Sequence, residues 1–198
     1  MTTALQERRC GDCDRCCSEL KIKTPEFRKK AHTLCAHHTG AGCGIYESRP
    51  QVCREFLCGW RLFAELDDSW RPDLSGVLIV RLSPAQLPPA WHAPGYGVQI
   101  AVTGGQAAII RPGFAEYVAA LLAQGVAVYL SAASPATLLN DHLGAAPDLK
   151  GIRRELLRLY HMLDAARWRR GVGMLLPLYR LQLDRQKQVS QRKHSNIK

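Results

Sequence analysis

Cys10-Gly-Asp-Cys13-Asp-Arg-Cys16-Cys17 is the stretch around which we expect the first part of this chain to fold. Two residues between successive cysteines place two sulfur atoms on one side of a tight turn, which is the arrangement that a tetrahedral metal ion or an iron–sulfur cluster needs. Cys10, Cys13 and Cys16 therefore form a natural arc of three sulfur ligands. The run opens like that of bacterial ferredoxins, but Cys17 then follows at once and no Cys-Pro pair comes three residues later.

Cys17 is expected to differ from the other three, because adjacent side chains generally diverge, above all in an extended backbone. We expect it to point away from the arc, where it packs, forms a bridge, or serves a second site with Cys35, Cys43 or a histidine. If Cys16 is the third ligand of the arc, Cys16→Ser is expected to abolish metal binding while Cys17→Ser keeps most of the metal. A loss of about half on Cys17→Ser would instead indicate two sites.

All eight cysteines of the 198-residue chain lie within its first 58 residues. Thiolates suit Zn²⁺, Cu(I) and iron–sulfur clusters alike, so the spacing predicts zinc or iron, an iron–sulfur cluster included, without choosing among them. Eight ligands suffice for two four-ligand sites, or for one site with spare thiols. The predicted metal ligands are Cys10, Cys13, Cys16, Cys17, Cys35, Cys43, Cys53 and Cys58.

Disulfide bonding and core packing are two further uses that proteins make of cysteine. An even number suits a disulfide framework, but a 22.0 kDa chain can bury enough surface to fold without one. Residues 1–9 lack the apolar segment of a secretory signal, so we expect a cytoplasmic protein, whose reducing surroundings favour metal or redox use of cysteine. Burial as small hydrophobic residues suits one or two of the eight, not all of them at these spacings.

Side chains near the cysteines indicate how such a site is completed. Neighbouring arginines can offset the negative charge of a thiolate centre, although each alone is more typical of a solvent-facing charge. Tyr46 and Phe56 are expected to supply apolar cover. His37 or His38 can replace one thiolate as a ligand, although a histidine pair is common on loop surfaces. The arginines within a few residues of a cysteine are Arg8, Arg9, Arg15, Arg49 and Arg54.

These residues together resemble a known family. The CxxCxxCC run, then Cys35, then Cys43-Gly-Ile-Tyr-Glu-Ser-Arg-Pro-Gln-Val-Cys53-Arg-Glu-Phe-Leu-Cys58 look like the bacterial YkgJ-like cysteine-cluster family, over residues 10–60. That family is described as a zinc- or iron-chelating domain, so the resemblance implies a metal- or cluster-binding module in which all eight cysteines take part. A flagellin lysine methylase carries a similar cluster, which implies the alternative of a cluster-dependent, protein-modifying enzyme. Residues 61–198 show no likeness to the rest of that enzyme.

The chain divides into three predicted parts, and its predicted fold class is α+β. Residues 1–60 form the cysteine-cluster module, residues 61–181 an α+β region packing against it, and residues 182–198 a basic mobile tail. Short apolar runs alternate with helical patterns in the second part, which predicts a small, mostly antiparallel α/β layer followed by an amphipathic basic helix.

Local patterns predict the individual elements of the second part. Gly104-Gly105 before Ala107–Ile110 predicts a β-hairpin with the strand that precedes it. Asp148 is expected to cap the last helix, whose apolar stripe includes Ile152 and Leu156. The expected strands are 77–82, 98–102 and 126–130, and the expected helices are 112–125, 134–144 and 148–170.

The charge of the chain is concentrated near its end. The formal net charge is +10, and residues 148–198 alone carry 13 Lys and Arg against 4 Asp and Glu. Such a surface, with Trp168 as a stacking platform, can bind nucleic acid or an acidic protein. A solvated helix face and a soluble tail also account for the charge, and we favour that interpretation because charge alone indicates only non-specific attraction. No apolar run approaches the roughly 18 residues that cross a bilayer, so no membrane partner is expected.

The sequence contains no P-loop, GxGxxG, HExxH or GxSxG motif. His92, His142 and His161 are isolated, and we see no catalytic carboxylate pair. The leading hypothesis is therefore a metal-binding protein that chelates zinc or iron through its cysteine cluster. The enzyme and the nucleic-acid-associated protein remain the alternatives, and the sequence does not decide whether the chain is an enzyme.

Overall fold

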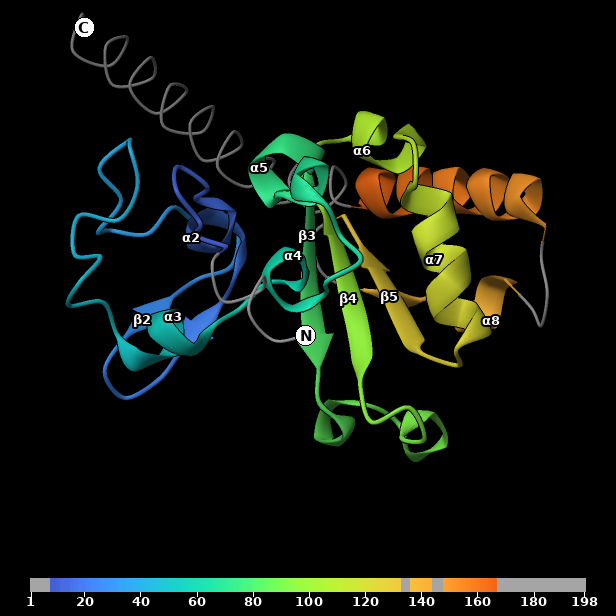
Figure 1. Cartoon of the computed structure of the whole chain (residues 1–198), viewed down its shortest axis with the longest axis horizontal. Helices are drawn as coiled ribbons and strands as arrows, with labels where there is room; N and C mark the ends of the chain where they lie inside the picture. The colour runs from blue at the N-terminus through green and yellow to red at the C-terminus, as the bar shows by residue number, and fades with distance from the viewer. Residues whose placement is uncertain (1–7, 133–135, 144–147, 167–198) are drawn as a thin grey trace, which may run out of the picture.

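A four-stranded sheet lies at the centre of the molecule, in the order β3-β4-β5-β6 (Figure 1). The computed structural model describes residues 8–132, 136–143 and 148–166. The strands are β3 (Val77–Leu82), β4 (Gly97–Val102), β5 (Ala127–Ser131) and β6 (Thr137–Leu138). The first and last pairs are antiparallel and the β4–β5 pair is parallel. The α+β class and the three predicted strands are confirmed, whereas β6 was not predicted.

The predicted hairpin after β4 is wrong, because α6 (Gln106–Ile110) is a helix. Both edges of β4 are already hydrogen-bonded, one to β3 and the other to β5, so a further strand has no free edge to join. Gly105, at a φ of 69°, turns the chain into α6 instead. The helix buries Ile109 and leaves Ile110 61% exposed, a difference that suits its place on the molecular surface.

α7 (Phe114–Ala123) is the longer of the two helices in the crossover that the parallel neighbours β4 and β5 require. It lies within the predicted helix 112–125, and its Phe114 and Val118 are fully buried against the sheet. Glu116 of α7 forms an ion pair with Arg153, which places the last described helix beside α7.

That last helix covers residues 149–166 and begins as predicted. The Asp148 carboxylate accepts a hydrogen bond from the backbone N–H of Gly151 at 2.7 Å, which is an N-terminal cap. Its apolar stripe is buried in the core and consists of Ile152, Leu156, Leu159 and Leu163. The predicted continuation to Arg170 lies outside the described residues.

The segment between β5 and this helix holds β6 and the short α8 (Asn140–Leu143). The Asn140 side chain accepts a hydrogen bond from the Val128 N–H at 2.8 Å and donates one to the Val126 carbonyl at 2.9 Å. These bonds tie α8 to the start of β5. Ser134-Pro135, the predicted start of the helix 134–144, lies outside the described residues. Within the described part of that range the prediction is wrong at Thr137–Leu138, which pair with β5 as β6, and α8 alone is helical.

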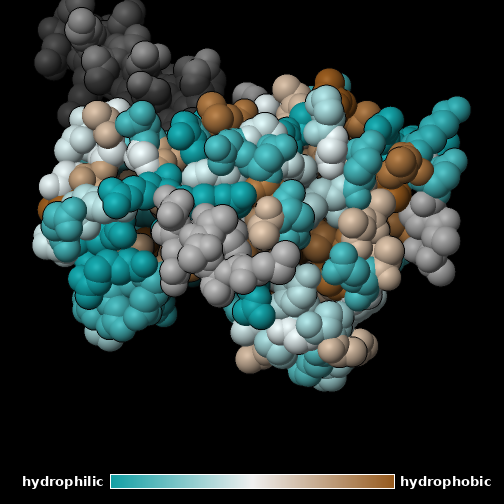
Figure 2. Space-filling view, in the orientation of Figure 1, coloured by the Kyte–Doolittle hydropathy of each residue, from teal (hydrophilic) through white to brown (hydrophobic). Residues whose placement is uncertain are grey.

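Short elements make up the cysteine-rich part, which lies beside β3, on the opposite side of the sheet from α7 and α8 (Figure 1). β1 and β2 pair antiparallel, and hydrophilic side chains cover the face around this hairpin (Figure 2). The elements before the sheet are α2 (Arg15–Glu19), β1 (Ile22–Lys23), β2 (Arg28–Lys29), α3 (Gln51–Glu55), α4 (Gly59–Leu62), η1 (Asp68–Trp70) and α5 (Pro72–Ser75). Two further turns, η2 (Pro84–Gln86) and η3 (Pro89–Trp91), join β3 to β4.

Close packing joins the cysteine-rich part to the sheet. Gly59 of α4 approaches β3 so closely that a Cβ atom added to it would lie 2.6 Å from the side chain of Ile79. Cys58, just before α4, is 8% exposed and belongs to the hydrophobic core. Arg8 donates a hydrogen bond to the carbonyl oxygen of Trp60. The chain around Cys58 is therefore held between the cysteines and the sheet.

Two predictions about partners meet the structure only in part. Within the described ranges, no helix combines the length and the apolar character that a membrane span requires. The predicted tail 182–198 lies outside the described residues, as does Trp168 with the arginines beside it, so the nucleic-acid alternative stays a prediction.

Candidate metal centre

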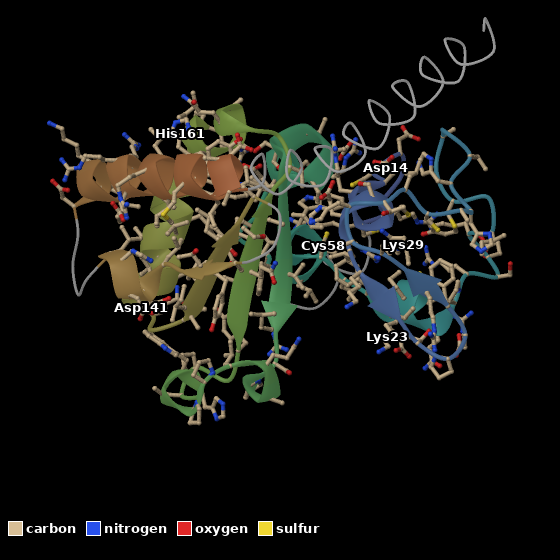
Figure 3. All side chains as sticks on the ribbon, turned by 180° about the vertical axis from the view of Figure 1, so that it is seen from behind. Asp14, Lys23, Lys29, Cys58, Asp141 and His161 are labelled. Carbon is tan, nitrogen blue, oxygen red and sulfur yellow. The ribbon has the colours of Figure 1, made fainter. Side chains whose placement is uncertain are left out.

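One cavity of about 220 Å³ is lined by all eight cysteines. Pro72 and Leu78, from α5 and β3, complete its wall, so residues after position 60 help to build the site. Seven of the cysteines are half-buried and Cys58 is buried, and within this described part of the chain none of them forms a disulfide. Figure 3 shows Cys58 at the junction of the cysteine-rich part with the sheet. The predicted ligands are thus brought together, from positions up to 48 residues apart.

α2 presents both Cys16 and Cys17 to this cavity. The expectation that Cys17 diverges from Cys16 holds only in part, because adjacent residues in a helix are about 100° apart around the axis, not opposed as in a strand, and both line the cavity. A second site for Cys17 stays a prediction. The two side chains hydrogen-bond each other. That bond is the main reason that the pKa of Cys17 is lowered to about 6 while the pKa of Cys16 is raised. Cys17 therefore ionises first, and Cys16 donates to it.

The turn before α2 fixes Cys10 and Cys13. The Cys13 N–H donates to the Cys10 carbonyl at 3.0 Å, and Gly11 allows the tight turn with a φ of 55°. The Cys13 thiol hydrogen-bonds the carboxylate of Asp73, which two bonds of 2.8 Å from Arg71 hold in place. Burial, together with the Asp73 charge, raises the pKa of Cys13 to about 11. α5 thereby contributes a carboxylate to the edge of the site.

Backbone hydrogen bonds hold the loop cysteines against α2. The Cys35 N–H donates to the Cys17 carbonyl at 3.1 Å, and the His38 N–H donates to the Cys35 carbonyl at 3.0 Å. His38 also forms an isolated antiparallel bridge with Cys43. Cys53 lies in α3, where burial and the charges of Cys17, Cys35 and Cys43 raise its pKa.

His38 has both ring nitrogens engaged, so it is not available as the predicted replacement ligand. Its Nδ1 accepts a hydrogen bond from the Gly40 N–H at 3.0 Å, and its Nε2 lies 3.0 Å from the Asp14 carboxylate. A nitrogen that accepts carries no proton, so Nε2 is the donor to Asp14. His37 does line the cavity, with its ring centroid 5.7 Å from that of Phe27. Of the two histidines, His37 is the one placed to reach a metal.

Lys29 is a buried cation beside the cysteines that was not predicted from the sequence. It is 8% exposed, and burial lowers its pKa, whereas the charges of Cys35 and Cys17 act in the opposite direction. Its Nζ donates hydrogen bonds of 3.1, 3.1 and 2.7 Å to the carbonyl oxygens of Ser18, Lys30 and Thr33. No local signal marks it, because Arg28 and Lys30 on either side are equally basic and are exposed.

Two guanidinium groups also line the cavity, those of Arg49 and Arg61. The Nε atom of each is buried and has no hydrogen-bond partner among the described residues. Arg49 stacks over the ring of Tyr46 at 3.8 Å, which fixes the plane of its guanidinium. Arg49 was predicted to neighbour the site, whereas Arg61 was not, although it follows Cys58 by only three residues.

The other predicted neighbours divide between the cavity and its surroundings. Tyr46 and Phe56 line the cavity as expected. Arg54 donates to the Arg49 carbonyl at 2.8 Å and so supports the turn before α3. Arg9 is exposed, as expected for an ordinary solvent-facing charge.

The donor set fits a thiolate-held group in the kind and number of its ligands and in the cations around them. Within the described ranges, however, no three cysteine, histidine or acidic side chains converge as the ligands of a single ion do. Sulfur ligands of a tetrahedral zinc lie about 3.8 Å apart, given a Zn–S bond of about 2.3 Å. Binding therefore requires thiols to rotate toward a common centre. In comparisons with known proteins, no family model, curated protein or solved structure matches this chain.

Proposed function

We propose that this chain is a metal-binding protein that holds zinc or iron, as ions or as an iron–sulfur cluster, in the cavity lined by its eight cysteines. The observation that carries the proposal is that one cavity collects every cysteine of the chain, although they come from α2, two loops, α3 and the start of α4. The resemblance of residues 10–60 to the YkgJ-like family supports the same function.

The lining of the cavity suits a thiolate centre. Thiolates are the ligands that zinc, copper(I) and iron–sulfur clusters prefer, and eight of them provide one or two complete ligand sets. Tyr46, Phe56 and Leu78 give the cavity an apolar wall, which limits access of water to metal–sulfur bonds.

Charge supports the same function. Four thiolates around Zn²⁺, or around an oxidised four-iron cluster, leave a net charge of about −2, which requires nearby cations. Lys29, Arg49 and Arg61 supply them, and the last two have a buried Nε that lacks an acceptor within the described chain. A thiolate centre offers such an acceptor, since its sulfur atoms accept hydrogen bonds.

Metal binding is expected to stabilise the fold of the cysteine-rich part. The helices and strands before the sheet have at most five residues each and leave most of their side chains partly exposed. A bound centre would link α2, the loop cysteines and α3, and by analogy with zinc-finger peptides such binding contributes about 10–16 kcal/mol to folding.

The test is the metal content of the full-length chain purified without oxygen. Zinc, iron and acid-labile sulfide are measured per chain, together with the absorption spectrum, because iron–sulfur charge transfer gives a broad visible band that zinc lacks. We expect stoichiometric metal. Zinc without visible absorption assigns zinc, and iron with sulfide assigns a cluster.

The proposal is contradicted if the purified protein is free of metal and shows eight reactive thiols. In that case the protein would also neither take up Zn²⁺ nor form a cluster from added iron and sulfide, and its melting temperature would be the same with and without these additions. The control is the same chain alkylated at its thiols, which cannot bind metal through sulfur and reports any adventitious uptake.

A further inference from the structure

We propose that the eight cysteines form two four-thiolate centres, and that the boundary between them runs between the adjacent residues Cys16 and Cys17. The inference rests on the proposed metal-binding function and specifies the ligands of each centre. The Cys10 set consists of Cys10, Cys13, Cys16 and Cys58, and the Cys17 set consists of Cys17, Cys35, Cys43 and Cys53.

The Cys10 set comes from the turn before α2, from α2 itself and from the residue that precedes α4. The N–H of Cys13 bonds the carbonyl of Cys10, so these two cysteines share one turn, and α2 then carries Cys16. Cys58 directly precedes α4, which packs against β3. This set is thus anchored to the sheet.

The Cys17 set is assembled within the cysteine-rich part. Cys35 bonds the carbonyl of Cys17 through its N–H, and the same loop pairs His38 with Cys43. α3 adds Cys53. These contacts link α2 to the loop cysteines by backbone hydrogen bonds, without involving the turn that holds the Cys10 set.

Contacts beside the cysteines follow the same division. Arg8, two residues before Cys10, donates hydrogen bonds to the carbonyl oxygens of Trp60 and Phe63, which closely follow Cys58. Arg49, four residues before Cys53, stacks on Tyr46, which follows Cys43 by three residues.

Each set has its own arginine. Arg61 follows Cys58 by three residues, and Arg49 precedes Cys53 by four. Both guanidinium groups line the cavity with a buried Nε that has no acceptor among the described residues. One negatively charged centre beside each arginine would satisfy both, whereas a single centre near one of them would leave the other without a partner.

α2 shows how adjacent cysteines can serve different centres. Their side chains leave the helix at directions about 100° apart, so one is able to face the turn at Cys10 while the other faces the loop at Cys35.

The test uses serine variants in pairs on the full-length chain, with zinc, iron and sulfide measured per chain after anaerobic purification. Cys13→Ser and Cys35→Ser are each expected to keep about half of the metal. The double variant Cys10→Ser/Cys13→Ser, within one set, should also keep about half. The double variant Cys13→Ser/Cys35→Ser, across the sets, should keep almost none.

The adjacent pair gives the sharpest comparison. Cys16→Ser should lose the same share of metal as Cys13→Ser, and Cys17→Ser the same share as Cys35→Ser. The double variant Cys16→Ser/Cys35→Ser should therefore lose both centres. The double variant Cys13→Ser/Cys16→Ser should lose only one. Loss of all metal in every single variant would overturn the inference in favour of one centre. Equal losses in the within-set and across-set doubles would overturn the assignment of ligands.

Two measurements separate these outcomes from misfolding and from failure of the proposed function. Fluorescence of Trp60 and Trp70, which are buried beside the sheet, reports whether each variant is folded. Uptake of Co²⁺ by metal-free protein, followed through thiolate-to-cobalt charge transfer, counts the centres without relying on the metal acquired in the cell. Wild-type protein that binds neither its own metal nor Co²⁺ contradicts the proposed function itself.

Discussion

At the scale of single residues, the ammonium of Lys29 is a buried charge near the thiols. Three carbonyl oxygens accept hydrogen bonds from it, and Cys17 and Cys35 are the thiols whose charge it balances. Hydrogen bonds to a charged group contribute about 1.5–3 kcal/mol, and a buried group left unpaired costs about as much. Lys29 therefore links the folding of the β1–β2 hairpin to the state of the thiols.

Lys29→Met is expected to weaken the metal binding proposed for the Cys17 set by about tenfold or more, which corresponds to about 1.4 kcal/mol. The variant removes the cation and leaves three carbonyl groups without their donor, so the free energy of unfolding should also fall by about 1.5–3 kcal/mol. Competition with a chelator of known affinity measures the first effect, and urea denaturation measures the second.

Lys23→Met is the matched control for that variant. Lys23 lies in the other strand of the same hairpin, so the charge of the chain changes by the same amount, but its side chain is exposed (Figure 3). We expect little change in affinity or stability, since exposed charges contribute little. Equal effects in both variants would show that net charge, and not the buried ammonium, supports the site.

At the scale of elements, the junction from α5 to β3 depends on a close contact between two backbone segments. Gly76 ends α5 with a φ of 65°, and its carbonyl accepts hydrogen bonds from the N–H groups of Thr103 and Gly104. A Cβ atom at position 76 would lie 2.5 Å from the Cα atom of Gly104. The same junction carries Asp73, the hydrogen-bond partner of Cys13.

Gly76→Ala is expected to lower the free energy of unfolding by about 2–5 kcal/mol. The left-handed conformation costs a non-glycine residue about 1–2 kcal/mol, and the clash with backbone adds a cost typical of overpacking, about 1–3 kcal/mol. Gly95→Ala is the control, because Gly95 has a φ of 75° but nothing lies within 4 Å of an added Cβ atom. Urea denaturation of both variants should show the conformational cost alone, about 1–2 kcal/mol, for Gly95→Ala. Equal losses would mean that the contact with Gly104 relaxes freely.

At the scale of the whole molecule, the sheet region and the cysteine-rich part differ in what they bury. The sheet and its helices contain fully buried side chains such as Val98, Ile100 and Leu130, whereas the cysteine-rich part consists of short elements around a cavity. A hydrophobic core stabilises a fold with or without metal, whereas the proposed thiolate centre would do so only while metal is bound.

Removal of metal by a chelator is therefore expected to speed amide hydrogen exchange in residues 8–57 while β3, β4 and β5 stay protected. The complementary variant is Leu156→Ala, which opens the core beneath the last described helix and should cost about 2–5 kcal/mol. It should weaken protection of the sheet and leave the metal content unchanged. If chelation speeds exchange equally in the sheet, the two halves unfold as one cooperative unit.

The sequence by itself determined the elements whose patterns are local. The strands at 77–82 and 98–102 and the helix around Phe114 were predicted from runs of apolar residues, because period and burial suffice to identify such segments. The cysteine spacing likewise predicted that the eight cysteines gather at one place, and all eight are among the residues that line the cavity.

Only the tertiary structure decided which segments are neighbours. Ala107–Ile110 has a composition that suits a strand, but it forms a helix because the rest of the chain occupies both edges of β4. Lys29 has no distinguishing neighbours in sequence, and its burial follows from three carbonyl groups that the fold brings to it. The orientation of Cys17 depended on whether its backbone is helical or extended. The physical reason is common to all three, because hydrogen-bond partners, free strand edges and side-chain directions are set by contacts between residues far apart in the sequence.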